Sequence, residues 1–564
     1  MKLNIQISWL FFFIMTTALV AFIRIAPAEE KEPLTFITVR KERVETPEEK
    51  ITFRVTSGQR QLFFDDEGIE DSKNLERIMH QPEKKGSVIT TDLPWEGIIQ
   101  TWSTPEWVAE DKCFKLWYFL TTTSGESGIA YAESRDGFSW SKPILRLVEL
   151  NGSLDNNLVT KDTIYNIIYD PDDTDPSRRY KALRLNVISE PHISADGITW
   201  KRSPRIIPQR HGNYYLSFVL NMEYHPESHD PSRRYTSIGY LMNREPMVSA
   251  DGFHWRSLNV PGIATADEGI LTYDRDTRTY IATVKQGELG IYGRSVTLST
   301  SKDFEHWSEP ELIFHADELD WKLAKDNIRE RLSNPEMMKN VYIDSNEFRS
   351  DVYNMRIFNY EGIYIGLPAF FHHTGLVPDK TNWDGFHIVQ LASSRDLKNW
   401  RRHGNRKPFL YPSKSASGAV DLTYIGGFSC PVIFGNELWF YYTGLKYRST
   451  PEGETNKGAV CLAVLRRDGF ISMDAGNKEG VLTTKTFFLT GSKLYVNVDA
   501  EKGWIQVDML DIDGNTIASS GRISGDIPRN EINWEKGNLK SIQQKGVALR
   551  FKLKNASFYS YWLE

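Results

Sequence analysis

Four carboxylates stand where apolar, strand-like runs begin, and acids placed in this way could converge to cleave a glycosidic bond. Glu96 precedes the run I-I-Q-T-W, and Asp351 opens the run D-V-Y-N-M. Asp267 and Glu268 precede I-L-T-Y. Glycoside hydrolysis needs one protonated carboxyl group to assist the leaving group and one ionised carboxylate to activate water or attack the anomeric carbon.

These positions predict Glu96 as the base or nucleophile, because it stands directly before a strand-like run. The acid, or a residue that raises the acid's pKa by like-charge repulsion, would be one of Asp267, Glu268 and Asp351. Turn capping or solvation of a strand end is the alternative role for each of the four.

Side chains that suit sugars lie near these acids. Trp95 could stack on a sugar face, and Tyr353 could donate a hydrogen bond beside Asp351. A run of short polar groups that could bind hydroxyls is formed by Asp155, Asn156 and Asn157. A plain loop explains this run as well.

Cationic and ring side chains extend the candidate site. Arg294 has forked donors that suit an anionic or sulfated sugar, with an ion pair inside the fold as the alternative. His372 and His373 end an apolar run, and Trp383 follows in the next loop. Adjacent residues of a strand point to opposite faces, so at most one of the two histidines serves the site. We assign this role to His372, and we predict no metal and no cofactor.

A repeated phrase, Ser-x-Asp-Gly-x-x-Trp, indicates the fold that carries these residues. It occurs at residues 134–140, 194–200 and 249–255, with looser copies ending at Trp307 and Trp400 and a decayed one at 467–470. The phrase D-P-S-R-R-Y also occurs twice, at 175–180 and 230–235. Repeats at a period of tens of residues indicate one supersecondary unit used many times.

Short β-branched runs separated by Asp, Pro and Gly lie between the repeats and predict four antiparallel strands per unit. An all-β propeller follows from this pattern. In each marker we expect Asp to accept backbone amide hydrogen bonds, Gly to adopt a positive φ, and Trp to pack between blades. Six units can be counted, at about 90–147, 154–205, 212–260, 264–315, 350–410 and 418–470.

The segments that flank these units differ in character. Residues 60–84 enter the fold and could supply the strand that closes the ring. After residue 470 the marker stops and long alternating strands predict an antiparallel β-sandwich at 471–564. We therefore predict a propeller at 61–470, preceded by a linker or edge arm at 29–60.

This arrangement resembles the glycoside hydrolases built on a five-bladed propeller, the invertases, levansucrases and arabinanases of families 32, 43 and 68. The resemblance rests on the markers, on P-W-E-G at 94–97, and on the sandwich after R-D-G-F. It is closest to family 32-like bacterial proteins and implies five blades, an axial active site and Glu96 at the nucleophile or base position. A six-bladed ring like that of a sialidase is the alternative. The family 32 signatures W-x-N-D-P-N-G, R-D-P and E-C are absent, so fructan cleavage is not expected.

The remaining features limit location and partners. Residues 1–28 resemble a secretory signal, with Lys2, an apolar run and A-P-A before the cleavage point, and an uncleaved membrane anchor is the alternative. A net charge of −6 argues against nucleic acid as a partner. Three distant cysteines predict no disulfide framework. We expect a secreted or periplasmic chain without stable membrane insertion after cleavage.

Three function classes follow from these observations. The first is an exported glycoside hydrolase that acts on a poly- or oligosaccharide through paired carboxylates in an axial pocket. The second is a non-catalytic propeller that binds carbohydrate, since a fold does not determine a function. The third is a scaffold for protein interactions. An enzyme should place two carboxyl groups about 5–10 Å apart in the pocket.

Overall fold

The computed structural model describes residues 53–184, 191–202, 218–240, 245–263, 269–286, 292–380, 382–537 and 545–564. All of them belong to one compact unit that spans residues 47–564. The predicted signal, most of the predicted linker, and the candidate acids Asp267 and Glu268 lie outside the described residues. Within the described ranges, no helix combines the length and the apolar character that crossing a bilayer requires.

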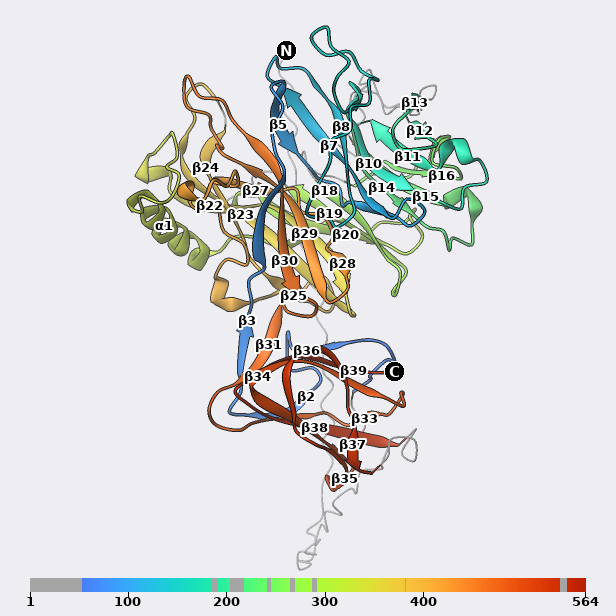
Figure 1. The fold of residues 1–564 in the computed structure, drawn as a ribbon, viewed down its shortest axis with the longest axis vertical. Coiled ribbons are helices and arrows are strands. Elements are labelled where there is room, and N and C mark those ends of the chain that lie inside the picture. The colour runs from blue at the N-terminus through green and yellow to red at the C-terminus, as the bar shows by residue number, and fades with distance from the viewer. Residues whose placement is uncertain are drawn as a thin grey trace, which may run out of the picture. The chain divides into compact units, whose positions relative to one another are not determined.

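Six antiparallel sheets of at least four strands make the propeller, one for each unit counted in the sequence (Figure 1). The first three blades are β5 (Glu96–Gln100), β7 (Cys113–Thr122), β8 (Ser127–Ser134) and β9 (Leu158–Thr160); β10 (Ile164–Tyr169), β11 (Tyr180–Arg184), β12 (His192–Ser194) and β13 (Lys201–Arg202); and β14 (Phe218–Tyr224), β15 (Tyr235–Tyr240), β16 (Pro246–Ser249) and β17 (Trp255–Ser257). Each blade is a meander that begins with its innermost strand.

The remaining blades are β18 (Gly269–Asp274), β19 (Thr279–Gln286), β20 (Ser295–Ser301) and β21 (Glu311–Phe314); β22 (Arg349–Tyr360), β23 (Ile363–Leu376), β25 (Ala392–Ser394) and β26 (Arg401–Arg402); and β27 (Tyr424–Gly426), β29 (Glu437–Leu445), β30 (Gly458–Arg466) and β4 (Glu83–Ile89). The preference for five blades was wrong, because every counted unit forms its own sheet. Three blades carry an additional short strand, β6 (Glu106–Val108), β24 (Trp383–Val389) and β28 (Val432–Phe434).

The ring closes through a strand from the start of the chain. β4 pairs antiparallel with β30, so the sixth blade takes its outermost strand from residues 83–89. The closing strand thus overlaps the end of the segment predicted for it. The earlier part of that segment forms β1 (Gln61–Leu62), β2 (Ile69–Lys73) and β3 (Glu76–Met79), which pair with the C-terminal strands instead.

The marker turns are held as the residue types predict. The Asp136 carboxylate accepts hydrogen bonds of 2.8 and 2.7 Å from the two backbone amides at 138 and 139. Gly137 has φ +75°, and a Cβ there would lie 2.4 Å from Trp439 of the sixth blade. Trp140 donates from Nε1 to the Gly137 carbonyl at 2.9 Å and packs its ring edge-on against Tyr441. The marker therefore joins one blade to the preceding blade around the ring.

The two looser markers adopt the same positive φ at the glycine position, although neither has a glycine there. Phe304 and Leu397 occupy the glycine position with φ 67° and 66°. Both side chains are buried, and a non-glycine residue with positive φ carries a backbone cost of about 1–2 kcal/mol. The packing of these two side chains offsets that cost.

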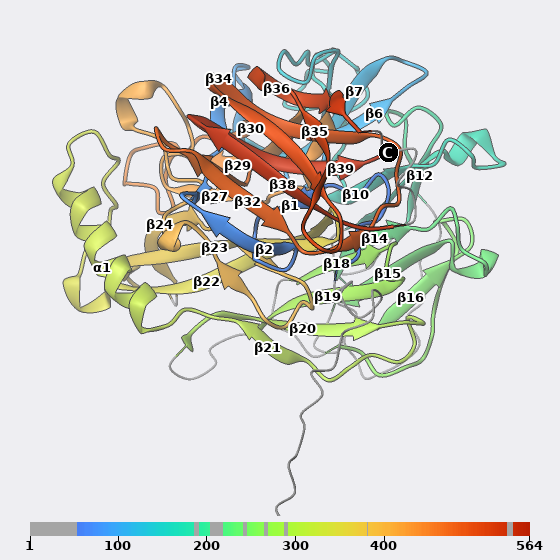
Figure 2. The same ribbon diagram turned by 90° about the horizontal axis from the view of Figure 1, so that it is seen from below.

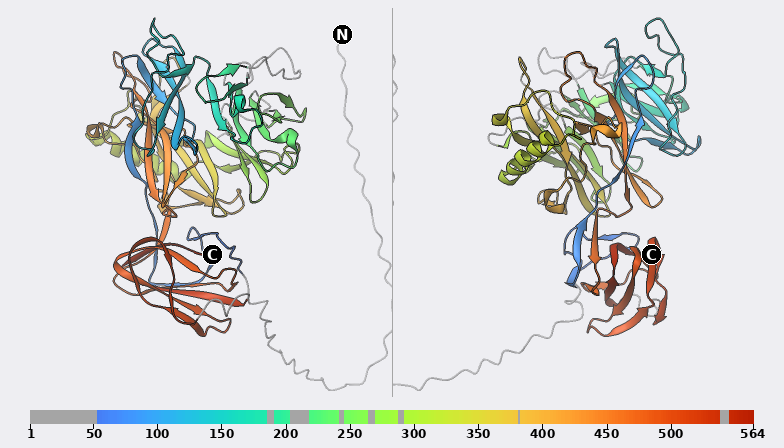
Figure 3. Two further views of the ribbon diagram at one scale, coloured as in Figure 1. Left: turned by 45° about the vertical axis from the view of Figure 1, so that its right-hand side comes forward. Right: turned by 60° about the vertical axis from the view of Figure 1, so that its left-hand side comes forward.

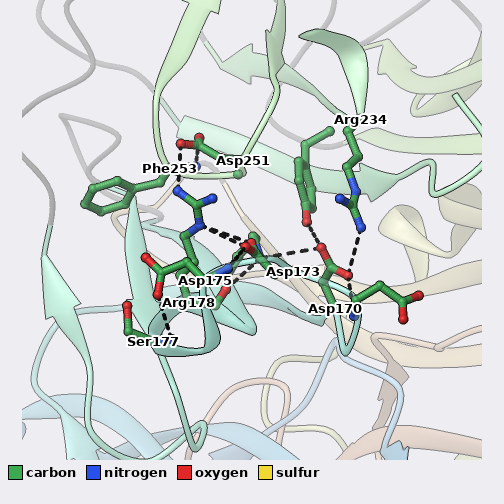
Figure 4. A network of polar contacts seen from close by, with 12 residues as sticks. Asp170, Asp173, Asp175, Ser177, Arg178, Arg234, Asp251 and Phe253 are labelled. Carbon is green, nitrogen blue, oxygen red and sulfur yellow. Dashed lines mark hydrogen bonds and ion pairs between the residues drawn. The ribbon is translucent and has the colours of Figure 1, made fainter. Parts of the chain in front are cut away.

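A buried polar network includes residues of the duplicated D-P-S-R-R-Y phrase (Figure 4). The Asp170 carboxylate, directly after β10, accepts hydrogen bonds from the hydroxyls of Tyr235 and Tyr224 in the third blade. Arg234 donates to it at 3.1 Å, and Lys181 Nζ lies 3.7 Å away. Because Asp170, Lys181 and Tyr235 are fully buried, this network fixes the second blade against the third.

The first copy of the phrase is anchored by its arginine. Arg178 pairs with Asp173 of its own loop at 3.0 Å and with Asp251 of the third marker at 3.3 Å (Figure 4). Asp175 accepts a hydrogen bond of 2.9 Å from the Ser177 amide and so caps the short 3-10 turn. The duplicated phrase is structural in both blades.

The C-terminal strands form one large curled antiparallel sheet with β1–β3. Its strands are β31 (Ile471–Ala475), β32 (Gly480–Thr484), β33 (Phe487–Phe488), β34 (Leu494–Leu510), β35 (Thr516–Ser520), β36 (Ile523–Glu531), β37 (Trp534–Lys536), β38 (Gly546–Lys554) and β39 (Ala556–Leu563). β2 pairs with β32 at one end of the strand order and β3 pairs with β31 at the other. Figure 1 shows the blue strand β3 beside the orange strand β31, and Figure 2 shows the blue strand β2 beside β32. Asp468, on the link from the propeller, accepts from Arg60, Tyr360 and Ser560 and ties the two parts together.

One helix, α1 (Glu318–Ser333), occupies the insertion between the fourth and fifth blades, and Figure 3 shows it at the periphery. Asp317 caps its first turn by accepting from the amides of Leu319 and Asp320. Ala324 and Ile328 are buried, and α1 contacts β22 and β23. The helix thus supports the inner hairpin of the fifth blade. Cys113, Cys430 and Cys461 are free thiols, as their spacing predicted.

Candidate functional site

Asp351 lies near the start of β22, the innermost strand of the fifth blade, with its side chain 5% exposed. Arg294, directly before β20 of the fourth blade, donates from Nη1 to its Oδ2 at 3.1 Å. Nε2 of His373 on β23 lies 3.2 Å from its Oδ1. In the β22–β23 register, Asp351 faces Phe371 and Arg349 faces His373, so these four side chains share one face of the hairpin.

The carboxyl group of Asp351 is held ionised. Burial raises its pKa, but His373 and Arg294 outweigh burial and hold the pKa below its usual range. Burial lowers the pKa of His373, even though Asp351 raises it. We therefore place the negative charge on Asp351 beside a neutral His373 ring. This arrangement supplies an anion suited to a base or nucleophile, and not a protonated acid.

The chain approaches Asp351 closely at Gly293. This residue has φ +67°, and a Cβ there would lie 3.2 Å from the Asp351 Cβ. The backbone amide of Arg294 follows, 3.4 Å from the Asp351 Oδ2. Glycine adopts this backbone conformation without strain and leaves room beside the carboxylate.

The ring of Tyr353 is partly exposed and surrounded by cations. Lys285 Nζ lies 4.6 Å from the ring centroid, and the guanidinium carbons of Arg294 and Arg448 lie 5.7 and 5.8 Å from it. Trp383 has the Arg349 guanidinium 4.5 Å from its centroid. Cation–π contacts of this kind contribute about 0.5–2 kcal/mol each. The forked donors of the guanidinium groups beside these rings suit an anionic group such as a sulfate or a carboxylate.

His387, on β24, packs against the rings of Tyr353 and Phe371. It is fully buried, its ring stacks on Phe371 at 4.7 Å, and Tyr424 packs edge-on at 4.6 Å. Neither ring nitrogen has a hydrogen-bond partner within the described part of the chain. Burial, with Arg448 and Arg294 nearby, lowers its pKa well below 6.5, so the ring is neutral. We refer to Asp351, Tyr353, Arg294, His373, Trp383 and His387 as the Asp351 cluster.

Three residues in or beside the Asp351 cluster were not predicted from the sequence: His387, Lys285 and Arg448. His387 could have been found from strand alternation, because it lies four residues after Trp383 and shares its face. Lys285 and Arg448 come from the neighbouring blades and carried no signal in the sequence. The cluster draws on the fourth and fifth blades, and Arg448 adds a cation from the sixth.

Glu96 begins β5 as its position predicted, but its carboxylate is committed to local contacts. Lys142 Nζ lies 2.8 and 2.9 Å from its two oxygens, and the amides of Asp92 and Leu93 donate at 3.1 and 3.0 Å. Burial raises its pKa, although Lys142 opposes this effect. These contacts indicate a carboxylate that holds the turn before β5. Trp95, within that turn, packs against the core of the first and sixth blades.

The D-N-N run also makes structural contacts. Asn157 donates to the Tyr118 hydroxyl at 2.8 Å and to the Tyr131 carbonyl at 2.7 Å. Asn156 donates to Val148 and accepts from the amide of Leu158. The exposed Asp155 pairs with Arg146 at 3.0 Å. None of the three contacts the Asp351 cluster through any of these bonds.

His372 points to the other face of β23, as the alternation of a strand requires. Its Nδ1 contacts the Ser350 hydroxyl at 2.9 Å, and its Nε2 contacts the Asn327 amide of α1 at 3.2 Å. Burial lowers its pKa to about 3. The geometry thus favours His373 over His372 as the histidine of the site. Over the described ranges, no group of three or more histidine, cysteine or acidic side chains could hold a metal ion.

The fold and the cluster define a six-bladed propeller with a cationic and aromatic site near the start of an inner strand. No family model matches the sequence, and no curated protein matches it. Solved structures to which the chain is similar include propeller glycoside hydrolases.

A Bombyx mori GH32 β-fructofuranosidase is 10% identical, with 85% of this chain and 93% of that chain covered and a TM-score of 0.32. The catalytic domain of a Coprinopsis cinerea GH62 α-L-arabinofuranosidase is 10% identical, with 68% and 97% covered and a TM-score of 0.34. An exo-β-1,3-galactanase from Phanerochaete chrysosporium is 9% identical, with 85% and 99% covered and a TM-score of 0.31. At these scores the likeness carries no argument of its own, and the propeller fold rests on the sheets of this chain.

Proposed function

We propose that this chain is an exported glycoside hydrolase that acts on a negatively charged poly- or oligosaccharide, with Asp351 as its ionised carboxylate. The observation that carries the proposal is the buried Asp351, held by Arg294 and His373 beside the partly exposed Tyr353 ring with its surrounding cations. The ring offers a surface on which a sugar can stack. The cations suit a sulfate or carboxylate on that sugar, because guanidinium groups bind such anions through forked hydrogen bonds.

In this proposal Asp351 attacks the anomeric carbon or activates water, and a second, protonated carboxyl group assists the leaving group. Asp267 and Glu268 remain the predicted sources of the second group. Export rests on residues 1–28, whose composition is that of a secretory signal.

The test is digestion of sulfated, uronic-acid and neutral polysaccharides by the purified chain, with measurement of released reducing ends. Wild type should release sugar from charged substrates in preference to neutral ones. Asp351→Asn should lower the rate by about 10²–10⁴-fold, the usual contribution of a positioned acid or base. Glu96→Gln is the matched control and should keep the specific activity of the folded fraction. Equal activity of wild type and Asp351→Asn would overturn the proposal.

A second candidate is a propeller that binds carbohydrate without cleaving it. Of the described carboxylates, Asp351 is paired with Arg294, and Glu347 accepts a hydrogen bond from Trp383 Nε1 at 3.0 Å. Both are engaged in contacts that position the cluster, which favours this candidate, since cleavage needs a carboxyl group free to protonate the leaving group. Saturable binding of a charged polysaccharide, weakened by Arg294→Ala and without release of sugar, would support this candidate over the hydrolase.

A further inference from the structure

A second concave site lies among the inner strands, away from the Asp351 cluster. It is a cavity of about 230 Å³ to which five of the six blades contribute. The lining residues used here are Trp102, Asn166, Asn221, Glu223, Arg275 and Arg356.

The charged and aromatic lining residues lie toward the opposite ends of the inner strands. Trp102 follows the end of β5, Glu223 is the next to last residue of β14, and Arg275 follows β18. Arg356 is five residues beyond Asp351 on β22, or about 16 Å at the ~3.3 Å rise of a strand. The two sites can therefore be occupied and tested independently.

We propose that this cavity binds one neutral monosaccharide unit, held between the Trp102 indole and the Glu223 and Arg356 side chains. A volume of 230 Å³ corresponds to about eight water molecules, which suits one sugar ring better than an oligosaccharide. A carboxylate and a guanidinium in one cavity supply acceptors and donors for neighbouring hydroxyls. The other guanidinium of the lining, Arg275, lies 3.4 Å from Glu227, so each arginine has an acidic side chain near it, which favours a neutral ligand.

The indole is positioned to form one wall. Trp102 is 38% exposed, and its ring packs against Phe119 at 5.3 Å. Gly427, with φ +64°, leaves room for the indole, because a Cβ there would lie 2.2 Å from the Trp102 Cδ1. An aromatic ring held in this way can stack on the apolar face of a sugar without losing further freedom on binding.

The Glu223 carboxylate is held in place by its neighbour Asn221. Asn221 is locked by two hydrogen bonds to the backbone of Leu271, at 2.6 and 2.7 Å, and it donates to Glu223 Oε1 at 3.2 Å. Burial raises the pKa of Glu223 to about 7, although Arg356 and Arg275 oppose this effect. Near neutral pH the group can thus accept a hydrogen bond from a hydroxyl or donate one to it.

The test is isothermal titration of the full chain with D-glucose, D-galactose and L-arabinose, and with D-galacturonate as the charged comparison. At least one neutral sugar should bind saturably and more tightly than galacturonate. Glu223→Gln and Trp102→Ala should each weaken this binding by at least tenfold. Asp351→Asn should leave it within twofold, whether or not the chain proves to be a hydrolase.

Two matched controls separate binding from folding. Glu106→Gln changes another acid whose pKa burial raises to about 7, and Trp107→Ala removes another exposed indole, and neither residue lines the cavity. Both controls should bind the sugar as wild type does. The inference is overturned if no neutral sugar binds saturably, or if binding is lost in Asp351→Asn and kept in Glu223→Gln.

Discussion

Asp170, directly after the inner strand of the second blade, accepts a hydrogen bond from the Tyr235 hydroxyl of the third blade. The fourth and fifth blades repeat the relationship, since Asp274 accepts from the Tyr364 hydroxyl at 2.5 Å. In the third blade the matching position is His225, whose ring instead meets the edge of Tyr280 at 5.4 Å. Acid-to-tyrosine contacts thus fasten some blade junctions and not others.

Asp170→Asn should destabilise the propeller strongly. The substitution removes the charge that faces Arg234 at 3.1 Å and the buried Lys181 at 3.7 Å, although Lys181 keeps Asp173 at 2.7 Å. Breaking a buried ion pair costs about 3–5 kcal/mol, and the retained partner places the cost at the lower end of that range. Urea unfolding measures the change in the free energy of unfolding. Asp175→Asn in the same loop is the control, because asparagine caps a helical turn about as well as aspartate. Equal costs for the two variants would refute the network's role.

The Glu96–Lys142 pair should contribute to stability and not to turnover. Glu96→Gln should lower the melting temperature, because it removes the charge that faces Lys142 at 2.8 Å. A double-mutant cycle with Lys142→Met should give a coupling energy of about 0.5–3 kcal/mol, the range for contacting residues. Thermal unfolding of the four proteins measures it. A large loss of specific activity with unchanged melting temperature would return Glu96 to the catalytic role that its position predicted.

The stability of the chain should fall between pH 5 and pH 8 because of Glu223 and Glu106. Burial raises the pKa of each from 4.5 to about 7, so the folded state binds its proton more tightly than the unfolded state. Their stabilising contribution is complete below pH 4.5 and is lost as the pH rises through 7.

Glutamine cannot ionise, so Glu223→Gln should match wild type near pH 5 and exceed it at pH 8 by about 1–2 kcal/mol, a figure reduced for partial exposure. Denaturant unfolding at both pH values measures the difference. A pH profile parallel to that of wild type would show that Glu223 is not the group responsible.

Gly293→Ala should impair the Asp351 cluster beyond its cost to the backbone. The substitution adds a methyl group 3.2 Å from the Asp351 Cβ at a position with φ +67°. Gly125→Ala is the matched control, since it has φ +86° and open space around its Cβ position. Both should lose about 1–2 kcal/mol of stability, and only Gly293→Ala should lower sugar release. Activity assays and unfolding curves on both variants make the comparison.

The markers sufficed to predict the blades, because each marker is a local turn whose Asp, Gly and Trp roles depend on neighbours in sequence. The choice of five blades came from resemblance and was wrong, whereas the count of six units agreed with the sheets. The strand start predicted at Glu96 agrees with β5, whereas β22 begins at Arg349, two residues before Asp351.

The sequence does not show which acidic side chains form ion pairs with cations that are distant along the chain. Lys142 lies 46 residues from Glu96 and reaches it from the loop after the first marker. The choice between His372 and His373 depended in the same way on the β22–β23 register, which pairs Arg349 with His373 and places Asp351 on the same face. Strand alternation alone limits the choice to one histidine and does not say which.

The ribosome synthesises the closing strand β4 long before its partner strand β30. Ile89 pairs with Val460, so at about 5–20 residues per second the ribosome needs roughly 20–75 s to deliver the partner of a strand it has already made. During that interval β4 is an unpaired edge, and such edges invite association with other chains. Its sequence E-K-K-G-S-V-I begins with three charged residues, which protect the waiting strand against wrong pairing until the ring can close.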